Sequence, residues 1–222
     1  MMKYEFKKYI AEFIGTFILV FNGIAAIIIN DLSNGAITHL GISLTFGFTV
    51  AFLIYTFGNV SGAHFNPAVS IALWKEKEIN SKHLLVYIVS QSAGAIIASL
   101  ILVALFGNIA NLGTTQPLQS LGNNTVLISL IVEIIYTFIL MIVILGSAVD
   151  TRSHQKFAGI AIGFTIAIGV LIIGPVSGAS FNPARSIGPA IISGNLNYLW
   201  IYIVGPIIGT LLATYTYKLI KE

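Results

Sequence analysis

The chain contains no cysteine, and charged residues make up only 9% of its 222 residues. Without thiols it cannot form disulfides, use a cysteine nucleophile or bind a metal through cysteine. Together with 56% hydrophobic residues, the low charge is too apolar for a soluble domain of this length. The sequence also has no nucleophile–base pair and no cluster of metal ligands. We therefore expect neither an enzyme nor a metal or cofactor site.

Six long hydrophobic stretches make up most of the chain. A helix needs about 20 residues to cross a bilayer of ~30 Å, and these stretches are that long. Glycines within them, such as Gly47 and Gly163, are typical of helices that pack closely in lipid. We predict an all-α membrane protein whose spans lie near residues 9–29, 39–57, 83–106, 126–149, 157–174 and 197–219.

The few basic residues are distributed unevenly along the chain. They precede the first stretch, follow the sixth, and lie in the second-to-third and fourth-to-fifth connections. The other three connections contain no Lys or Arg except Arg185. By the positive-inside rule this pattern predicts six crossings with both termini in the cytoplasm. The net charge of +3 thus reflects topology in a lipid bilayer and does not indicate a nucleic-acid partner.

One phrase of sequence occurs twice. Residues 61–71 and 177–187 are identical at nine of eleven positions, and the two copies are 116 residues apart. Glu12 in the first stretch likewise recurs as Glu133 in the fourth. We interpret the chain as a single membrane domain, 1–222, built from two repeats at about 5–106 and 126–220. Because each repeat has three crossings, the second must lie inverted relative to the first.

Each copy of the phrase contains an Asn-Pro-Ala motif, and Asn followed by Pro is a preferred way to start a helix. The segments that follow, 67–74 and about 183–192, are too short to cross a membrane alone. We predict two re-entrant half-helices that enter from opposite sides, with their positive N-terminal ends meeting near the midplane. The preceding Ser-Gly-Ala-x-Phe segments are predicted to be extended and to line a wet cavity with carbonyls. The motifs are Asn66-Pro67-Ala68 and Asn182-Pro183-Ala184.

These duplicated motifs resemble those of the major intrinsic protein family, the aquaporins and glycerol facilitators. The resemblance covers almost the whole chain. It implies an aquaporin-like fold of six transmembrane helices and two half-helices, assembled as a homotetramer in the plasma membrane. It also implies a passive channel for water and small neutral solutes, in which the converging helix ends exclude protons and ions, as in aquaporin-type pores.

The resemblance further implies an outer constriction, the selectivity filter, formed by Phe46, Val170, Ala179 and Arg185. An arginine at membrane depth is costly and by default functional, and the position equivalent to Arg185 in the first repeat is Val69. Strict water channels carry His at the Val170 position, so we expect a wider and less hydrophilic filter here. The set is similar to that of some archaeal aquaporins and of plant nodulin-type intrinsic proteins.

The acids within the spans, Glu12 and Glu133, have two interpretations. As proton-relay carboxylates they would indicate a coupled transporter. Their equivalent positions in the two repeats favour a structural role, in which each accepts backbone N–H groups from the loop before a half-helix. His64 and Ser180 precede the two motifs at equivalent positions, and we expect both to line the pore.

Three functions therefore stay open. The leading one is a passive channel for water with some leak of a small neutral solute, for which glycerol, ammonia, hydrogen sulfide and hydrogen peroxide are candidates. Ser186 and Ala190 agree with water channels at positions where glycerol facilitators carry Asp and a basic residue. The alternatives are a facilitator of glycerol or a similar polyol, and a proton-coupled secondary transporter.

Overall fold

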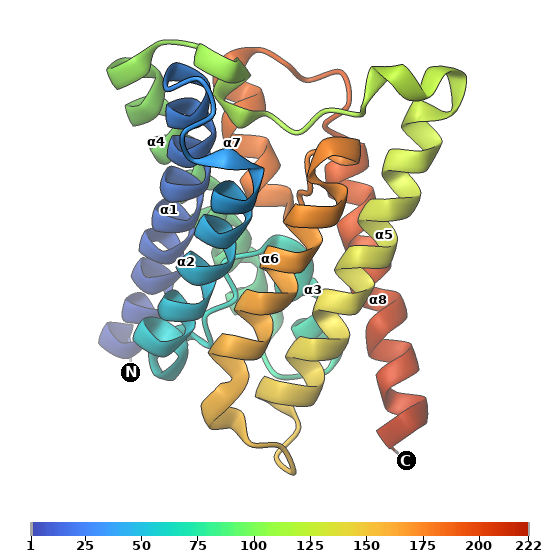
Figure 1. Ribbon diagram of the computed structural model, residues 1–222. Helices are drawn as coiled ribbons and strands as arrows, with labels where there is room; N and C mark the ends of the chain where they lie inside the picture. The colour runs from blue at the N-terminus through green and yellow to red at the C-terminus, as the bar shows by residue number, and fades with distance from the viewer. Residues whose placement is uncertain (1, 222) are drawn as a thin grey trace.

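The computed structural model describes residues 2–221, with side chains from residue 5 onward. The described chain is helical and contains no strand (Figure 1). Six helices are long and apolar enough to cross a membrane, so the predicted all-α membrane fold is confirmed. They are α1 (Met2–Leu32), α2 (Thr38–Ser61), α4 (Ser81–Phe106), α5 (Thr125–Ile144), α6 (Ala158–Ser177) and α8 (Ile201–Lys221).

Several helix ends differ from the predicted ones. α1 begins at Met2 rather than near residue 9, because its first turns are rich in Lys and Glu, which are good helix formers. α2 continues past residue 57 to Ser61 and ends at Gly62, whose left-handed φ of 88° closes the helix. α8 begins at Ile201 rather than near 197, because residues 197–200 form turns.

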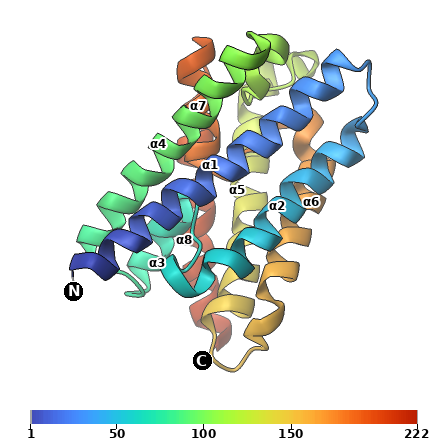
Figure 2. The same ribbon diagram turned by 90° about the vertical axis from the view of Figure 1, so that its left-hand side faces the viewer.

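Two short helices, α3 (Pro67–Lys75) and α7 (Pro183–Ser193), lie inside the bundle. Both chain ends lie on one side of the molecule, here called the terminal side, and α3 occupies this half while α7 occupies the opposite half (Figures 1 and 2). Short 3₁₀ segments, η1 (Ile109–Gly113) and η2 (Gln119–Asn124), lie on the opposite side. The connection from α5 to α6 on the terminal side holds a π-turn, η3 (Leu145–Val149), and η4 (Gln155–Phe157).

Glycines bring the long helices into close contact. A Cβ on Gly47 of α2 would lie 2.5 Å from the carbonyl oxygen of Gly163 on α6, and a Cβ on Gly163 would lie 2.6 Å from that of Gly47. A Cβ on Gly94 of α4 would lie 2.4 Å from a backbone oxygen of α1, and a Cβ on Gly209 of α8 would lie 2.4 Å from a backbone oxygen of α5. No other residue fits at these crossings, which hold the six helices tightly around a centre.

The connection after α5 is attached to α8 by a charged cluster on the terminal side. The Arg152 guanidinium donates to both carboxylate oxygens of Asp150, with Nη2–Oδ2 at 2.7 Å. The Tyr217 hydroxyl on α8 donates to the same carboxylate at 2.9 Å. Hydrogen bonds from the Arg152 side chain and backbone hold the pKa of Asp150 well below its usual range. The carboxylate is therefore charged at physiological pH and keeps the connection in place.

We expect Asp150→Asn to lower the unfolding temperature of the detergent-solubilised protein, because it removes the ion pair with Arg152 while preserving side-chain size. A carboxyl whose pKa is depressed by folding stabilises the fold above its unfolded pKa of about 4, and loses this effect as the pH falls through the folded pKa. The difference between wild type and variant should be constant from about pH 8 to pH 5 and shrink below about pH 4.

Unfolding temperatures measured across this pH range by size-exclusion chromatography of heated samples test this prediction. Asp31→Asn is the matched control, because Asp31 is exposed at the end of α1, and it should behave like wild type. A stability gap of constant size down to pH 2 would contradict the assigned role of Asp150.

Candidate functional site: a pore between the two half-helices

The two half-helices start in the same way at the centre of the molecule. Asn66 and Asn182 are in extended conformation, with φ of −154° and −151°, and each is followed by a proline at the first helical position. The Asn66 Oδ1 accepts from the backbone N–H of Ala68 at 2.9 Å, and the Asn182 Oδ1 accepts from that of Ala184 at 3.0 Å. Each asparagine thus caps its half-helix and holds the positive helix end at the pore.

The same asparagines connect the two repeats. The Nδ2 of Asn66 donates to the carbonyl oxygen of Phe181 at 2.7 Å, and the Nδ2 of Asn182 donates to that of Phe65 at 2.8 Å. A side-chain amide carries two hydrogens, so each Nδ2 keeps one further N–H. Both asparagines line the central cavity. Two N–H donors are therefore fixed in position beside any molecule that passes this point.

The loops before the half-helices are turned and not extended, so this part of the sequence prediction is wrong. Gly62, Ala63 and Phe65 have φ of 88°, 53° and 50°, and Ala179 and Phe181 have φ of 46° and 55°. In an extended strand, successive N–H groups point to opposite sides. Here the N–H groups of two successive residues both point toward one buried carboxylate. The left-handed residues turn the backbone so that both N–H groups face the same side.

Glu12 is that carboxylate for the first loop. Its Oε1 accepts from the backbone N–H of His64 at 3.0 Å and from the Ser61 hydroxyl at 2.6 Å. Its Oε2 accepts from the N–H of Phe65 at 2.7 Å and from the Nε2 of Gln91 at 2.8 Å. The carboxylate is fully buried and accepts from donors on two helices, α2 and α4, and on the loop.

Glu133 has the corresponding position in the second repeat. It accepts from the backbone N–H groups of Ser180 and Phe181, both at 2.9 Å, and from the Ser177 hydroxyl at 2.8 Å. Glu133 is also fully buried, and neither it nor Glu12 is among the residues that line the cavity. Both glutamates therefore contact the loops and not the transport path.

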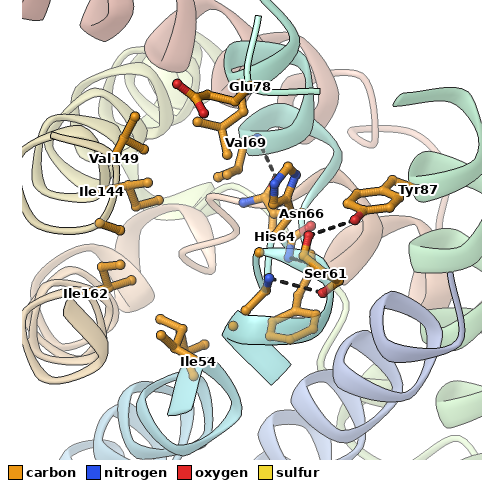
Figure 3. A pocket seen from close by; sticks show the side chains of 18 of the residues that line it. Ile54, Ser61, His64, Asn66, Val69, Glu78, Tyr87, Ile144, Val149 and Ile162 are labelled. Atoms are coloured by element: carbon orange, nitrogen blue, oxygen red, sulfur yellow. Dashed lines mark hydrogen bonds between the residues drawn. The ribbon is translucent and has the colours of Figure 1, made fainter. Parts of the chain in front are cut away.

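A cavity of about 1070 Å³ runs from residues on the terminal side, such as Lys77 and Gln155, to Arg185 in the opposite half. One wall is apolar and is contributed by α2, α5 and α6 with the π-turn. The other wall carries the motif loop and its polar groups (Figure 3). The labelled residues of the apolar wall are Ile54, Ile144, Val149 and Ile162.

His64 and its neighbours form the polar wall on the terminal side. The His64 Nδ1 lies 3.0 Å from the Ser70 Oγ, and its ring packs edge-on against Tyr87 with centroids 5.0 Å apart. The Tyr87 hydroxyl donates to the carbonyl oxygen of Ser61 at 2.7 Å (Figure 3). His64 is 9% exposed, so its ring reaches the cavity while these contacts fix its orientation.

Ser180 lines the cavity at the equivalent position of the second repeat. Its hydroxyl lies 2.6 Å from the Ser186 Oγ, and Ser186 in turn lies 2.7 Å from the Thr115 Oγ1 in the loop before η2. The second half of the path thus replaces an imidazole with a small hydroxyl. Thr115 was not singled out in the sequence, because nothing in the spacing relates the long loop to this position.

The four residues expected in the filter all line this cavity. The Arg185 Cζ lies 5.3 Å from the centroid of the Phe46 ring, within the range of a cation–π contact. Val170 and Ala179 complete the lining, and all four side chains are at most 5% exposed. The Arg185 Nε has no hydrogen-bond partner among residues 5–221. This N–H is buried and unpaired next to the cavity that the four residues line.

Gly113 holds Arg185 and was missed by sequence reasoning. The Arg185 Nη1 donates to the Gly113 carbonyl oxygen at 2.9 Å. Residues 110–113 are all left-handed, with φ between 47° and 57°, a conformation that costs ordinary residues about 1–2 kcal/mol each. Leu112 within this turn is fully buried and anchors it to the bundle. The turn therefore presents one carbonyl to the guanidinium, which no local sequence signal indicates.

The chemistry available along this path is limited to hydrogen bonding. Donors to a passing molecule occur at the paired asparagines and at Arg185, polar side chains such as His64 and Ser180 line one wall, and the facing wall is apolar. Among the described residues no three His, Cys, Asp or Glu side chains come together as metal ligands. The remaining motif residues, Pro67, Ala68, Pro183 and Ala184, start the half-helices and do not line the cavity. Such a path suits small polar molecules without charge.

We expect Glu133→Gln to destabilise the protein by about 1–3 kcal/mol, because an amide NH₂ would face one of the loop N–H groups and leave a buried donor unpaired. Thermal unfolding in detergent and water flux in liposomes measure the effect. Ser129→Ala on the same helix is the control, because the Ser129 hydroxyl makes only a 3.5 Å contact with the Val176 carbonyl oxygen. If Glu133→Gln were as stable as this control, the carboxylate would not be needed to hold the loop.

Comparisons with known proteins agree with this geometry. The family model described as "Major intrinsic protein" matches residues 2–217. Aquaporin NIP1-1 of Zea mays is 43% identical over 216 residues, which cover 97% of this chain and 75% of the relative. Nodulin-26 of Glycine max is 41% identical, with 97% and 78% covered. The X-ray structure of the aquaglyceroporin from Plasmodium falciparum superposes with a TM-score of 0.81 at 27% identity, over 96% of this chain and 95% of that one. The chain therefore belongs to the major intrinsic protein family, whose members are channels, and is a passive membrane channel for water and small solutes.

Proposed function

We propose that this channel conducts water rapidly and small neutral solutes more slowly, and that it excludes protons and ions. The observation that supports this proposal is that Phe46, Val170, Ala179 and Arg185 all line the central cavity, with the Arg185 guanidinium over the Phe46 ring. Val170 offers an apolar wall where a polar imidazole would narrow the path. Because this wall offers water no hydrogen bond, a solute that replaces water there breaks none. The size of the solute then decides how fast it passes.

In this proposal the remaining pore residues have distinct roles. Asn66 and Asn182 donate to a passing oxygen at the centre, where the N-terminal ends of both half-helices repel cations. Arg185, which lines the cavity, adds a second positive barrier and hydrogen-bond donors at the filter. His64 and Ser180 line the path between these levels and the openings.

The alternative is a facilitator whose main cargo is glycerol or a similar polyol. The likeness to a solved aquaglyceroporin and the apolar Val170 favour it. Ser186 favours water. Its hydroxyl is engaged by Ser180 and Thr115, and serine places no charged group at a position where glycerol facilitators carry Asp. A proton-coupled transporter is disfavoured, because Glu12 and Glu133 hold loops outside the cavity.

We expect purified protein in liposomes to accelerate osmotic shrinkage strongly and to accelerate glycerol entry less. Val170→His should reduce glycerol entry by about tenfold or more while largely preserving water flux, because a larger polar wall group narrows the filter. Stopped-flow light scattering in sucrose and in glycerol measures both rates, and an imposed proton gradient should change neither.

Wild-type glycerol entry as fast as water flux would assign the protein to the facilitators. Dependence of either flux on the proton gradient would support the coupled transporter instead. Liposomes no more permeable than empty ones would contradict an open channel.

We also propose that residues 5–106 and 126–220 are inverted repeats of one channel domain, 1–222, and that this domain forms a homotetramer in the plasma membrane. The order of a long, a long, a short and a long helix in each half supports the repeats. The terminal side would face the cytoplasm, as the basic residues near Lys82, Arg152 and Lys218 suggest.

The absence of cysteine makes the orientation directly testable. With a membrane-impermeant maleimide, Asn197→Cys should be labelled on intact cells, whereas Gln155→Cys should be labelled only after lysis. Both positions are exposed, so accessibility to the reagent depends on the side of the membrane. The reverse labelling would invert the proposed topology. A detergent-corrected mass other than four chains in light scattering would contradict the tetramer.

A further inference from the structure

Gly23 in the middle of α1 lies directly behind the filter. Gly23 is buried, and a Cβ built on it would lie 2.2 Å from both Cε1 and Cζ of the Phe46 ring and 2.9 Å from Cδ1. Contacts below about 3 Å do not occur for real Cβ atoms, so the edge of the ring occupies the space that any side chain at this position would need. The ring is thus set back into α1 only because residue 23 has no side chain.

The two helices that carry this contact cannot easily separate. Beside it, the Nδ2 of Asn22 on α1 donates to the Oγ1 of Thr49 on α2 at 3.3 Å, and Thr49 is almost fully buried. α1 is also held on its other side by the close crossing with α4 at Gly94. A methyl group at residue 23 must therefore move the Phe46 ring rather than the helix, since overpacked cores respond by shifting side chains.

The direction of that movement is set by what surrounds the ring. Phe46 lines the cavity, and the Arg185 guanidinium lies over its ring at 5.3 Å. With α1 behind the ring and the lumen in front of it, the open space is the pore. A ring displaced from Gly23 moves toward Arg185 and narrows the constriction.

The side chains at the corresponding positions in the other half of the channel differ in size from those of Gly23 and Phe46. Ile144 lies as far after Glu133 as Gly23 lies after Glu12, and Ile162 corresponds to Phe46 across the repeat. Both isoleucines line the cavity (Figure 3). The second half thus has two medium-sized side chains where the first half has a glycine and a large phenylalanine. The pair of residues at this level, one from each of two helices, determines together how far the wall projects into the lumen.

We propose that Gly23 is a specificity-determining positioning residue, which sets the width of the filter through the position of the Phe46 ring. This inference rests on the proposed filter and extends it to a residue that touches no permeating molecule. Gly23→Ala should lower glycerol permeability in liposomes by roughly tenfold or more, the factor that an added barrier of about 1.4 kcal/mol imposes. Water is smaller than glycerol, so its permeability should fall much less.

The experiment compares water and glycerol fluxes per reconstituted protein in wild type, Gly23→Ala, Phe46→Leu and the double variant Gly23→Ala/Phe46→Leu. Leucine lacks the Cε1 and Cζ atoms, which make the two closest contacts of 2.2 Å with a methyl group at residue 23, and keeps only a flexible methyl at the Cδ1 position, so the double variant should match Phe46→Leu in both fluxes. Gly146→Ala is the matched control, because the nearest atom to its added Cβ is 3.5 Å away and it does not line the cavity. It should match wild type.

A fall in both fluxes by the same factor, or unchanged selectivity in Gly23→Ala, would overturn the inference. If Gly23→Ala does not fold, the comparison of the double variant with Phe46→Leu still decides, because a glycerol loss in that background would show that residue 23 acts independently of the ring. The proposed filter fails separately, if Phe46→Leu leaves the ratio of glycerol to water permeability at the wild-type value.

Discussion

Every other feature of this channel depends on satisfying irregular backbone at the depth of the membrane. The loops before α3 and α7 start at the ends of α2 and α6 and run into the middle of the molecule, at a depth where lipid offers no hydrogen bonds. Glu12 and Glu133 provide the acceptors from behind, and Asn66 and Asn182 provide caps and cross-links in front. Without these partners the loops could not remain open at the centre, and the half-helices would have no fixed point at which to meet.

The fixed loops explain how an apolar path can still select. Because the loop N–H groups are used by the buried glutamates, the positions of the asparagine and arginine donors do not change as molecules pass. A permeating molecule meets preorganised donors at the paired asparagines and at Arg185, opposite an apolar wall. In this proposal the positive helix ends and Arg185 exclude charged species, and the width of the constriction selects neutral solutes by size. Under the same proposal, both halves of the chain contribute to the exclusion of charge and to the width of the filter.

The two halves of the chain share supporting contacts but differ in the side chains that face the lumen. The carboxylates, the caps and the helix crossings occur in both halves with closely similar distances. The residues that face the lumen differ, with His64 opposite Ser180 and Val69 opposite Arg185 in the alignment of the repeats. Gly113, in a loop of left-handed residues outside the duplicated motifs, fixes Arg185 in the second half only. Function is therefore concentrated in the places where the duplication is broken.

The sequence by itself determined the helices, the two half-helices and the residues that meet in the pore, because apolar length and the Asn-Pro motif report local physics. It also indicated the partners of Glu12 and Glu133, because the duplication placed both acids at one equivalent position. The turned backbone at Ala63 and Phe65, the carbonyl of Gly113 and the seat of the Phe46 ring on Gly23 were decided by tertiary structure. Each depends on which groups from distant segments converge on one point, and no spacing along the chain encodes that convergence.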